Sequence, residues 1–331
     1  MTTHCYHTTP SGHKVNLTLH GTDGPVLITF HGGGIVNGSR RDDHVPKPVR
    51  DRWPGTIIEA DYHLLIPSSG FDILADMAGL FSYLLTLPIQ HHQLYLSGFS
   101  GGGYPLRLAA ILAAEEKRKN IPRFTVRGWV SFFGMGGDFL LDYWLTPRSS
   151  VTKRLLGSDH DVSETERWTE TLQEWYSADT EFSDLPYTEG LSGHVPTRGR
   201  VWESLHGLAC FNDAVTGDRG FSRRLAALPY SERPAAVPES CRAVYPQLYF
   251  ESGASSLGEA LPPCLLIHGD SDDVVPYEET LRTFAALKAA AAGVEVLTIS
   301  GADHDLCVDG AVSPHAVQAY EYAVAWMLAL L

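Results

Sequence analysis

The sequence predicts an α/β protein with a mostly parallel, doubly wound sheet. Short apolar runs rich in β-branched residues alternate with longer segments in which apolar residues recur every three or four positions. The short runs are almost continuously apolar, which is typical of parallel strands buried on both faces. With 331 residues and 44% apolar side chains, the chain can bury a large core, either as one enlarged domain or as two ordinary ones.

The expected elements follow from these patterns. Parallel strands are predicted at residues 26–30, 56–60, 93–97, 126–133, 264–268 and 294–299. Helices are predicted at 72–87, 101–119, 277–292 and 314–331. The alternation over residues 15–19 predicts an antiparallel strand before the parallel set.

One stretch, residues 137–261, lacks this alternation of strands and helices. It is acidic and rich in turns, and it holds four tryptophans, Trp144, Trp168, Trp175 and Trp202. The S-x-x-E pattern from Ser163 to Glu166 has the form of a capping box and predicts a helix that ends near residue 177. We expect the segment to be a mainly helical insertion whose aromatic side chains form its own core rather than contact a ligand.

Charge and cysteine usage exclude several classes of protein. Twenty-five Lys and Arg against 39 Asp and Glu give a net charge of −14, which repels nucleic acid and anionic membranes. The odd set of cysteines has no CxxC pair, so neither a disulfide framework nor a zinc site is expected; they are Cys5, Cys210, Cys241, Cys264 and Cys307. The N-terminus has no secretion-signal pattern, and no window reaches the roughly 20 apolar residues of a membrane span. We therefore expect a cytoplasmic protein.

Residues 98–102, Gly-Phe-Ser-Gly-Gly, fit the pattern G-x-S-x-G between a predicted strand and a predicted helix. Ser100 would then stand on a strained turn that lifts its hydroxyl above the sheet. The N–H of Gly101 would lie beside it at the positive end of the helix dipole. This context predicts a nucleophilic serine with a neighbouring donor for an oxyanion.

A second glycine-rich motif, residues 31–34 (His-Gly-Gly-Gly), directly follows the first parallel strand. Its glycines would allow backbone N–H groups to approach the serine and face charge that develops in a tetrahedral intermediate. We interpret His31 itself as a structural residue that shapes this loop.

A serine nucleophile needs a histidine base and a carboxylate that orients it. Among 15 histidines, position favours His304, because it follows the last predicted strand and would lie at the same sheet edge as Ser100. Three aspartates follow the predicted strand at residues 264–268 and would lie at the same edge; they are Asp270, Asp272 and Asp273. The chain order of serine, aspartate and histidine is that of α/β-hydrolases.

These motifs resemble the α/β-hydrolase superfamily and, within it, the serine carboxylesterases and lipases of the hormone-sensitive-lipase-like, or fold-3, group. The resemblance covers roughly residues 25–135 and 262–331. Its aspartate motif lies on residues 269–276 and favours Asp272, with Asp273 second. By that likeness, Gly33, Gly34 and Gly101 would supply the oxyanion donors, and no cofactor or metal would be needed.

Because Ser100 precedes the irregular stretch and the other two residues follow it, we expect a discontinuous catalytic domain of residues 1–136 and 262–331. Residues 137–261 would be an inserted lid that lies over Ser100 and forms the pocket for the acyl or alcohol group. The expected activity is cleavage of a small hydrophobic ester or thioester, and the charge of −14 favours neutral substrates. A peptidase, an amidase, a hydrolase of natural products that includes C–C bond cleavage, and a non-catalytic ligand-binding protein remain alternatives.

Overall fold

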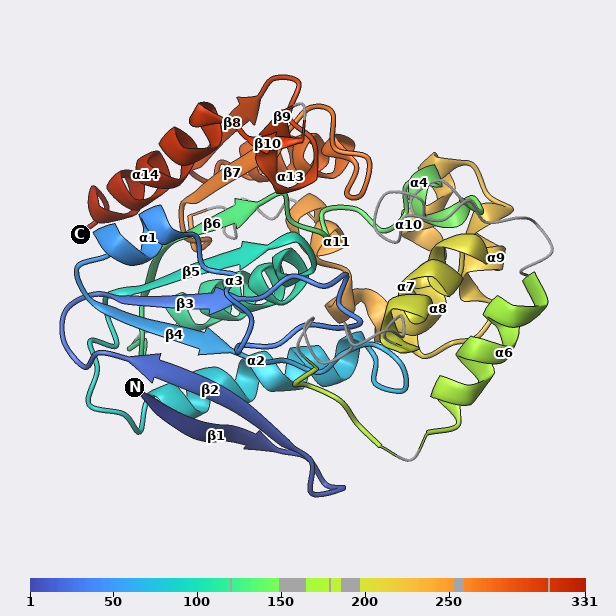
Figure 1. Ribbon diagram of the computed structural model, residues 1–331, viewed down its shortest axis with the longest axis horizontal. Helices are drawn as coiled ribbons and strands as arrows, with labels where there is room; N and C mark the ends of the chain where they lie inside the picture. Colours follow the sequence, from blue (N-terminus) through green and yellow to red (C-terminus); the bar gives the residue numbers. More distant parts are fainter. Residues whose placement is uncertain (120, 149–164, 179, 186–196, 253–258, 309) are drawn as a thin grey trace.

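The computed structural model describes residues 1–119, 121–148, 165–178, 180–185, 197–252, 259–308 and 310–331. An eight-stranded sheet crosses the molecule (Figure 1), with the strands in the order β1-β2-β4-β3-β5-β6-β7-β8. The strands are β1 (Thr2–Thr8), β2 (Lys14–His20), β3 (Val26–Phe30), β4 (Thr56–Ala60), β5 (Leu94–Phe99), β6 (Val126–Phe132), β7 (Cys264–Gly269) and β8 (Val294–Ile299). β1 and β2 pair antiparallel, β2 pairs antiparallel with β4, and the strands from β4 to β8 are parallel.

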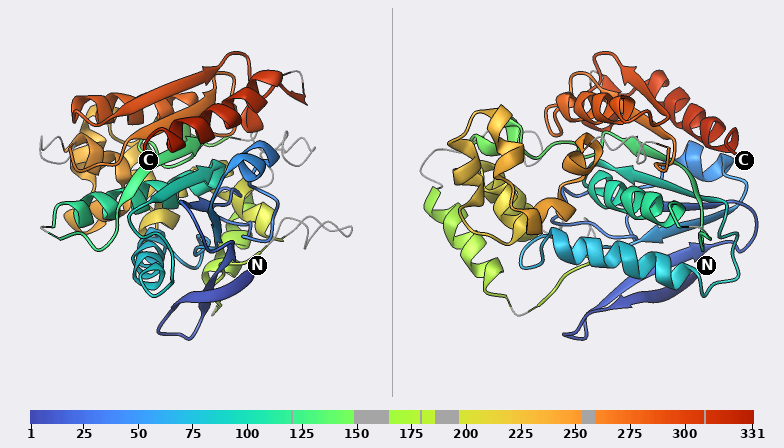
Figure 2. Two further views of the ribbon diagram at one scale, coloured as in Figure 1. Left: turned by 90° about the vertical axis from the view of Figure 1, so that its left-hand side faces the viewer. Right: turned by 180° about the vertical axis from the view of Figure 1, so that it is seen from behind.

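Side chains alternate between the two faces of the sheet, as the period of two in a strand requires. In β3, Val26, Ile28 and Phe30 enter one core cluster, while Leu27 enters the other. Helices α2 (Gly70–Leu84), α3 (Gly103–Lys117) and α13 (Tyr277–Ala289) cover the first face, and α1 (Lys47–Arg52) and α14 (Pro314–Leu328) cover the second (Figure 2). The mostly parallel, doubly wound sheet expected from the sequence is therefore confirmed.

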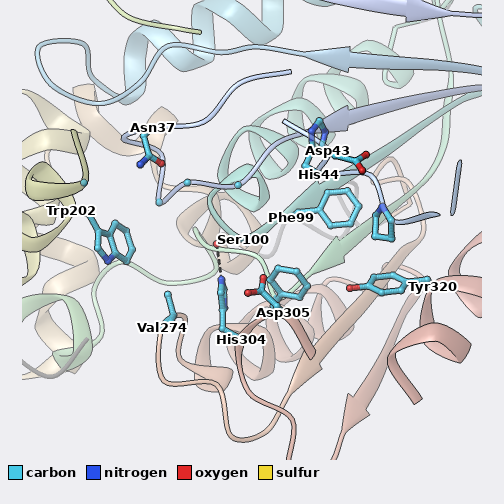
Figure 3. A pocket seen from close by; sticks show the side chains of 16 residues that line it. Asn37, Asp43, His44, Phe99, Ser100, Trp202, Val274, His304, Asp305 and Tyr320 are labelled. Carbon is cyan, nitrogen blue, oxygen red and sulfur yellow. Dashed lines mark hydrogen bonds between the residues drawn. The ribbon is translucent and has the colours of Figure 1, made fainter. Parts of the chain in front are cut away.

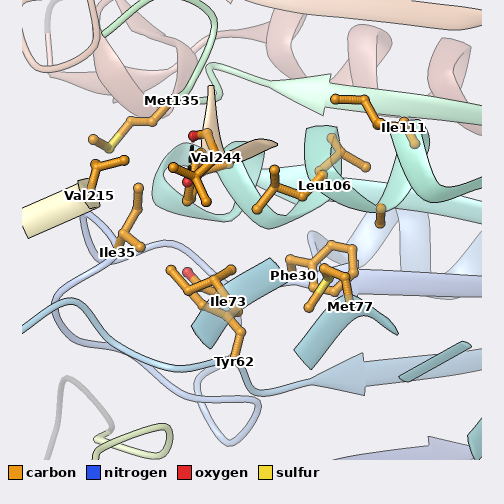
Figure 4. Packing of buried hydrophobic residues seen from close by; sticks show 14 of the residues in the cluster. Phe30, Ile35, Tyr62, Ile73, Met77, Leu106, Ile111, Met135, Val215 and Val244 are labelled. Carbon is orange, nitrogen blue, oxygen red and sulfur yellow. Dashed lines mark hydrogen bonds between the residues drawn. The ribbon is translucent and has the colours of Figure 1, made fainter. Parts of the chain in front are cut away.

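The larger core cluster lies between the sheet and the helices α2 and α3 (Figure 4). Phe30 from β3, Met77 from α2 and Leu106 from α3 are fully buried there. Burying each such side chain contributes about 1.5–3 kcal/mol relative to leaving it in water. This packing anchors the base of α3, the helix that begins just after Ser100.

Three details differ from the sequence-based expectation. The exposed, polar strand β1 and the six-residue helix α1 give weak periodic patterns and were not predicted. Helix α3 begins at Gly103 because residues 100–102 form a 3₁₀ turn. Helix α2 begins two residues earlier than expected, because Ser69 and Asp72 form a capping box at its start.

A helical segment lies beyond the carboxyl ends of the parallel strands (Figure 1). Its described helices are α4 (Asp142–Leu145), α6 (Thr165–Tyr176), α7 (Thr197–Gly207), α8 (Phe211–Thr216), α9 (Phe221–Ala226) and α10 (Arg233–Ala236). Helix α11 (Pro246–Glu251) instead packs against the sheet beside α3 and α13, where Phe250 contacts Trp129 of β6. No described residue between 137 and 261 belongs to a strand of the sheet. The helix predicted over 163–177 is α6, while Ser163 of the predicted capping box lies outside the described residues.

Arg198 joins α7 to the loops that follow β3 and β4. Its guanidinium is buried and donates hydrogen bonds to the carbonyl oxygens of Val36 and Leu65, both at 2.8 Å, and of Ile66. Burial lowers the pKa of Arg198 to about 9, so the group remains charged at neutral pH. The charged guanidinium, bound to three backbone carbonyl groups, therefore connects helix α7 to the loops at the edge of the sheet.

We predict that Arg198→Met destabilises the protein by about 3 kcal/mol, because three buried carbonyl groups lose their donor. Denaturant unfolding monitored by circular dichroism measures this loss. Arg200→Met, two residues along the same helix and half-buried, is the control and should cost well under half as much. Equal losses in the two variants would contradict the role assigned to the three hydrogen bonds.

Candidate active site

The turn between β5 and α3 holds Ser100 in a left-handed conformation, with φ of 50°. Such a conformation is unfavourable for a residue with a Cβ and costs on the order of 1–2 kcal/mol. The flanking glycines are sterically required. A Cβ on Gly98 would lie 2.3 Å from the carbonyl oxygen of Gly102, and one on Gly102 would lie 2.2 Å from that of Phe30. The motif G-x-S-x-G thus has the strand-turn-helix geometry expected from the sequence.

Ser100, His304 and Asp272 form a continuous chain of hydrogen bonds. Nε2 of His304 lies 2.9 Å from Oγ of Ser100, and Nδ1 of His304 lies 2.8 Å from Oδ2 of Asp272 (Figure 3 shows the first contact). An ionised Asp272 accepts the Nδ1–H, which leaves Nε2 as the acceptor for the serine hydroxyl. The structure thus brings together the three side chains singled out in the sequence, at the carboxyl edge of the sheet.

The side chain of Asp272 is fully buried, and four donors surround its carboxylate. Oδ1 accepts the N–H groups of Val274 (2.8 Å) and Val275 (2.9 Å). Oδ2 accepts from His304 and from Nε2 of His268, at 3.0 Å. Burial by itself raises the pKa of Asp272, but the charge of His304 and the hydrogen bonds of both histidines outweigh it and hold the pKa well below its ordinary value.

His268, which the sequence analysis did not single out, is a neighbour of this chain. It is fully buried at the end of β7, and its Nδ1 lies 2.7 Å from Oγ1 of Thr280 on α13. Because Nε2 faces two acceptors, Asp272 and the carbonyl oxygen of Val275 (3.1 Å), that nitrogen carries the proton. Its position directly before Gly269 is the signal that could have identified it.

Asp270, one of the competing carboxylates, has a different partner. Its Oδ1 accepts the N–H of Gly301 at 2.6 Å, and the residue is exposed. For Asp273, the backbone carbonyl accepts the hydroxyl of Tyr143. Of the three candidate aspartates in the loop after β7, Asp272 is the one that forms a hydrogen bond with His304.

The glycine-rich loop after β3 lies against the Ser100 turn. A Cβ on Gly101 would stand 2.7 Å from the nitrogen of Gly34 and 2.6 Å from that of Ile35. Gly33 and Gly34 have φ of 100° and 61°, in the left-handed region that favours glycine. The N–H groups of Gly33, Gly34 and Gly101 have no acceptor among the described residues, so they are available to a negatively charged oxygen at Ser100.

His31 lies beneath this loop and shapes it. Its ring is fully buried, stacks on Tyr62 with 4.4 Å between centroids, and donates from Nδ1 to the carbonyl oxygen of Gly32 at 2.8 Å. Burial, with a smaller effect from His44, lowers the pKa of His31 to about 3, so the ring is neutral. The hydroxyl of Tyr62 also donates to the carbonyl oxygen of His31, at 2.7 Å. These contacts hold the loop against the sheet.

Ser100 and His304 line a cavity of about 590 Å³ (Figure 3). Trp202 and Val274 lie on one side of Ser100, and Phe99, Asp305 and Tyr320 lie on the other. The remaining lining residues are Gly32, Gly33, Gly34, Asn37, Asp43, His44, Pro46, Phe133 and Gly199. Most of this surface is apolar, which suits a small organic ligand.

Trp202 is the tryptophan of the helical segment that lines the cavity, whereas most of the aromatic side chains there were expected to form the core of that segment. It is buried, but its ring packs so closely on Gly34 that a Cβ there would lie 2.2 Å from it. Trp144 and Trp168 are buried away from the cavity, as expected. Helix α7 therefore contributes a wall of the cavity, a contact that depends on tertiary packing and has no signal in the sequence.

Comparisons with known proteins place the fold. A structure described as an alpha/beta hydrolase superfamily protein from Enterococcus faecalis matches with a TM-score of 0.57 and 18% identity, over 97% of each chain. This chain has the α/β-hydrolase fold. An esterase from Pyrobaculum calidifontis matches it with a TM-score of 0.56 and 17% identity, over 97% of this chain and 83% of that one.

Two further comparisons concern particular parts. The model of the prolyl oligopeptidase family matches residues 228–331, which include Asp272 and His304. A Mycobacterium tuberculosis puromycin-hydrolyzing peptidase matches with a TM-score of 0.56 and 16% identity, over 100% of this chain and 39% of that one. No curated protein matches the chain. The fold implied by the resemblance to α/β-hydrolases is thus confirmed.

The described residues contain neither a membrane-spanning helix nor a metal site. None of the described helices is long and apolar enough to cross a membrane. No group of three His, Cys, Asp or Glu side chains in the described ranges is arranged to hold a metal ion. None of the five cysteines forms a disulfide.

We predict that Asp272→Asn destabilises the protein by about 3 kcal/mol at pH 7. The folded-state pKa of Asp272 lies below its unfolded-state value of about 4, so its contribution is present above that pH and is lost as the pH falls through the folded-state pKa. Denaturant unfolding of wild type and Asp272→Asn across this pH range should show that the difference between their free energies of unfolding decreases in acid.

Asp270→Asn is the control for this prediction, because it changes an exposed carboxylate of the same loop that accepts one N–H. It should cost less than about 1 kcal/mol. A difference between wild type and Asp272→Asn that stays constant down to pH 3 would contradict the pKa assigned to Asp272.

Proposed function

We propose that the protein is a serine hydrolase that cleaves an ester or thioester of a small hydrophobic substrate. The observation that carries the proposal is the hydrogen-bonded chain from Ser100 through His304 to Asp272, placed on a strained turn that opens into a cavity. The esterases among the structural neighbours support the ester bond as the substrate. Their likeness is one of fold, so the site geometry carries the chemistry.

In the proposed reaction, Oγ of Ser100 attacks the substrate carbonyl and its proton passes to Nε2 of His304. The N–H groups of Gly33, Gly34 and Gly101 stabilise the resulting oxyanion. His304 then protonates the leaving alcohol or thiol as the tetrahedral intermediate collapses to an acyl-enzyme. Water, deprotonated by His304, then attacks the acyl carbon. The bond from this carbon to Oγ of Ser100 breaks, His304 returns its proton to Oγ, and the acid is released. Asp272 stabilises the imidazolium and fixes the tautomer of the neutral imidazole.

We further propose that residues 1–136 and 262–331 form the catalytic domain and that residues 137–261 act as a lid. The contact of Trp202 with Gly34 supports this division, because it brings α7 to the edge of the proposed oxyanion site. The ring would then limit the space for the acyl or alcohol group on that side of Ser100.

Peptide or amide cleavage is the second candidate activity. It is favoured by the prolyl oligopeptidase family model, which spans the proposed base and its carboxylate. The same proton transfers serve an amide, whose poorer leaving group makes protonation by His304 more demanding. Comparing a p-nitrophenyl ester with the matched p-nitroanilide distinguishes the two, and the ester is expected to react at least about a thousandfold faster.

We predict that Ser100→Ala lowers kcat/KM for p-nitrophenyl butyrate by about 10⁴-fold or more and abolishes labelling by a fluorophosphonate. Ser97→Ala is the matched control, because Ser97 lies three residues earlier, in strand β5, and its buried hydroxyl has no partner in the described structure. It should retain both properties. Labelling that persists in Ser100→Ala would overturn the assignment of the nucleophile.

We also predict that Trp202→Leu shifts the preference toward longer acyl chains, because it removes a ring from the cavity wall. The ratio of kcat/KM for the octanoate to that for the acetate ester should rise by about tenfold, given the 1–3 kcal/mol that a methylene is worth in such pockets. Trp175→Leu, on α6 and outside the cavity, should leave the ratio unchanged. An unchanged ratio in Trp202→Leu would contradict the placement of this wall.

A further inference from the structure

One end of the cavity carries negative charge. Asp305, the residue after His304, lines it together with Asp43, and the lining residues include no lysine or arginine. Asp43 lies 3.5 Å from Arg50 and is almost fully exposed, so its charge is partly offset. The carboxylate of Asp305, by contrast, receives no hydrogen bond from the described residues, although it is next to the proposed base.

The backbone around Asp305 adopts an energetically unfavourable conformation. Asp305 and Leu306 have φ of 65° and 61°, two consecutive left-handed residues that are not glycine. Each such residue costs on the order of 1–2 kcal/mol, and strain of this kind persists where surrounding structure enforces it. The fully buried Leu306 anchors the turn, while Asp305 is left exposed beside the cavity.

A second, independent group faces the same space. Tyr320 of α14 is 8% exposed and lines the cavity, and its hydroxyl has no hydrogen-bond partner in the described structure. Figure 3 shows this hydroxyl directed toward the part of the cavity that holds Asp305. The lone pairs of this hydroxyl oxygen carry negative partial charge, so they attract a cation placed beside Asp305.

The walls around these groups are aromatic. Phe99 and Phe133 line the cavity and lie 6.4 Å apart between ring centroids, and Phe133 also packs on the ring of His304 at 4.9 Å. Aromatic faces attract cations through their quadrupole, and carboxylates do so through their charge. Together these features are complementary to an ammonium group.

We propose that this end of the cavity, formed by Asp305, Tyr320, Phe99 and Phe133, binds a positively charged group of the substrate. The inference rests on the proposed function, since it names the substrate class of the same site. It departs from the expectation of neutral substrates drawn from the net charge of −14. A strongly negative protein with carboxylates in a cleft instead attracts cations to it.

The test uses pairs of esters that differ in one atom, nitrogen or carbon. Butyrylcholine and 3,3-dimethylbutyl butyrate place the charge, or its neutral counterpart, on the alcohol. Ethyl 4-(trimethylammonio)butanoate and ethyl 5,5-dimethylhexanoate place it on the acyl group. We expect wild type to favour the cationic member of at least one pair by about tenfold in kcat/KM, and that pair identifies which side of the ester occupies the subsite.

Asp305→Asn should reduce this cationic-to-neutral ratio by about five- to tenfold, because it removes the charge while asparagine tolerates the left-handed backbone. Glu278→Gln removes an equal charge from an exposed site on α13 and should leave the ratio at its wild-type value. Tyr320→Phe tests the hydroxyl and should raise KM for the preferred cation. Thermal unfolding of each variant establishes that it is folded.

Two outcomes separate this inference from the proposed function. If wild type hydrolyses the neutral esters but prefers neither cation, or if Asp305→Asn keeps the wild-type ratio, the subsite is wrong and the hydrolase stands. If wild type hydrolyses none of the four esters, or Ser100→Ala matches it, the proposed function itself is overturned.

Discussion

The buried carboxylate of Asp272 is the group on which the arrangement of the site depends. It accepts four hydrogen bonds, two from the backbone of its own loop and two from His268 and His304. A buried carboxylate is costly unless it is paired, so these donors both stabilise the charge and hold the carboxylate in place. Through His304 the same group reaches Ser100, which comes from a strand about 170 residues earlier in the chain (272 − 100 = 172).

A second constraint is the close approach of backbone segments around Ser100. Gly98, Gly101, Gly102 and Gly34 all stand where a Cβ would meet another atom within 2.7 Å. There is therefore no room for a side chain at these positions, because the loop after β3, the turn after β5 and Trp202 of α7 are in close contact. This packing joins the sheet, which provides the rigid frame, to the helical segment, which provides a wall of the cavity.

The sequence predicted much of this site because its signals are local. Ser100 lies in a motif whose glycines are required by steric contacts with residues close to them in the sequence. His304 and Asp272 follow strands that are clearly marked by their apolar runs. The sequence could not single out Trp202 among the four tryptophans of the insertion, and the contributions of Tyr320 and Asp305 could not be predicted. They depend on how α7 and α14 pack against the cavity and on a left-handed turn at Asp305, and none of these leaves a periodic pattern.

The central claim is that Ser100 is the nucleophile and that Gly33, Gly34 and Gly101 bind the oxyanion. A crystal structure of the protein after reaction with a small alkyl phosphonate tests it most directly. The account predicts a bond from phosphorus to Oγ of Ser100, the phosphoryl oxygen about 2.7–3.1 Å from these backbone nitrogens, and Trp202 as the tryptophan in contact with the alkyl group. A phosphonate on another side chain, or a phosphoryl oxygen turned away from the glycine loop, would contradict it.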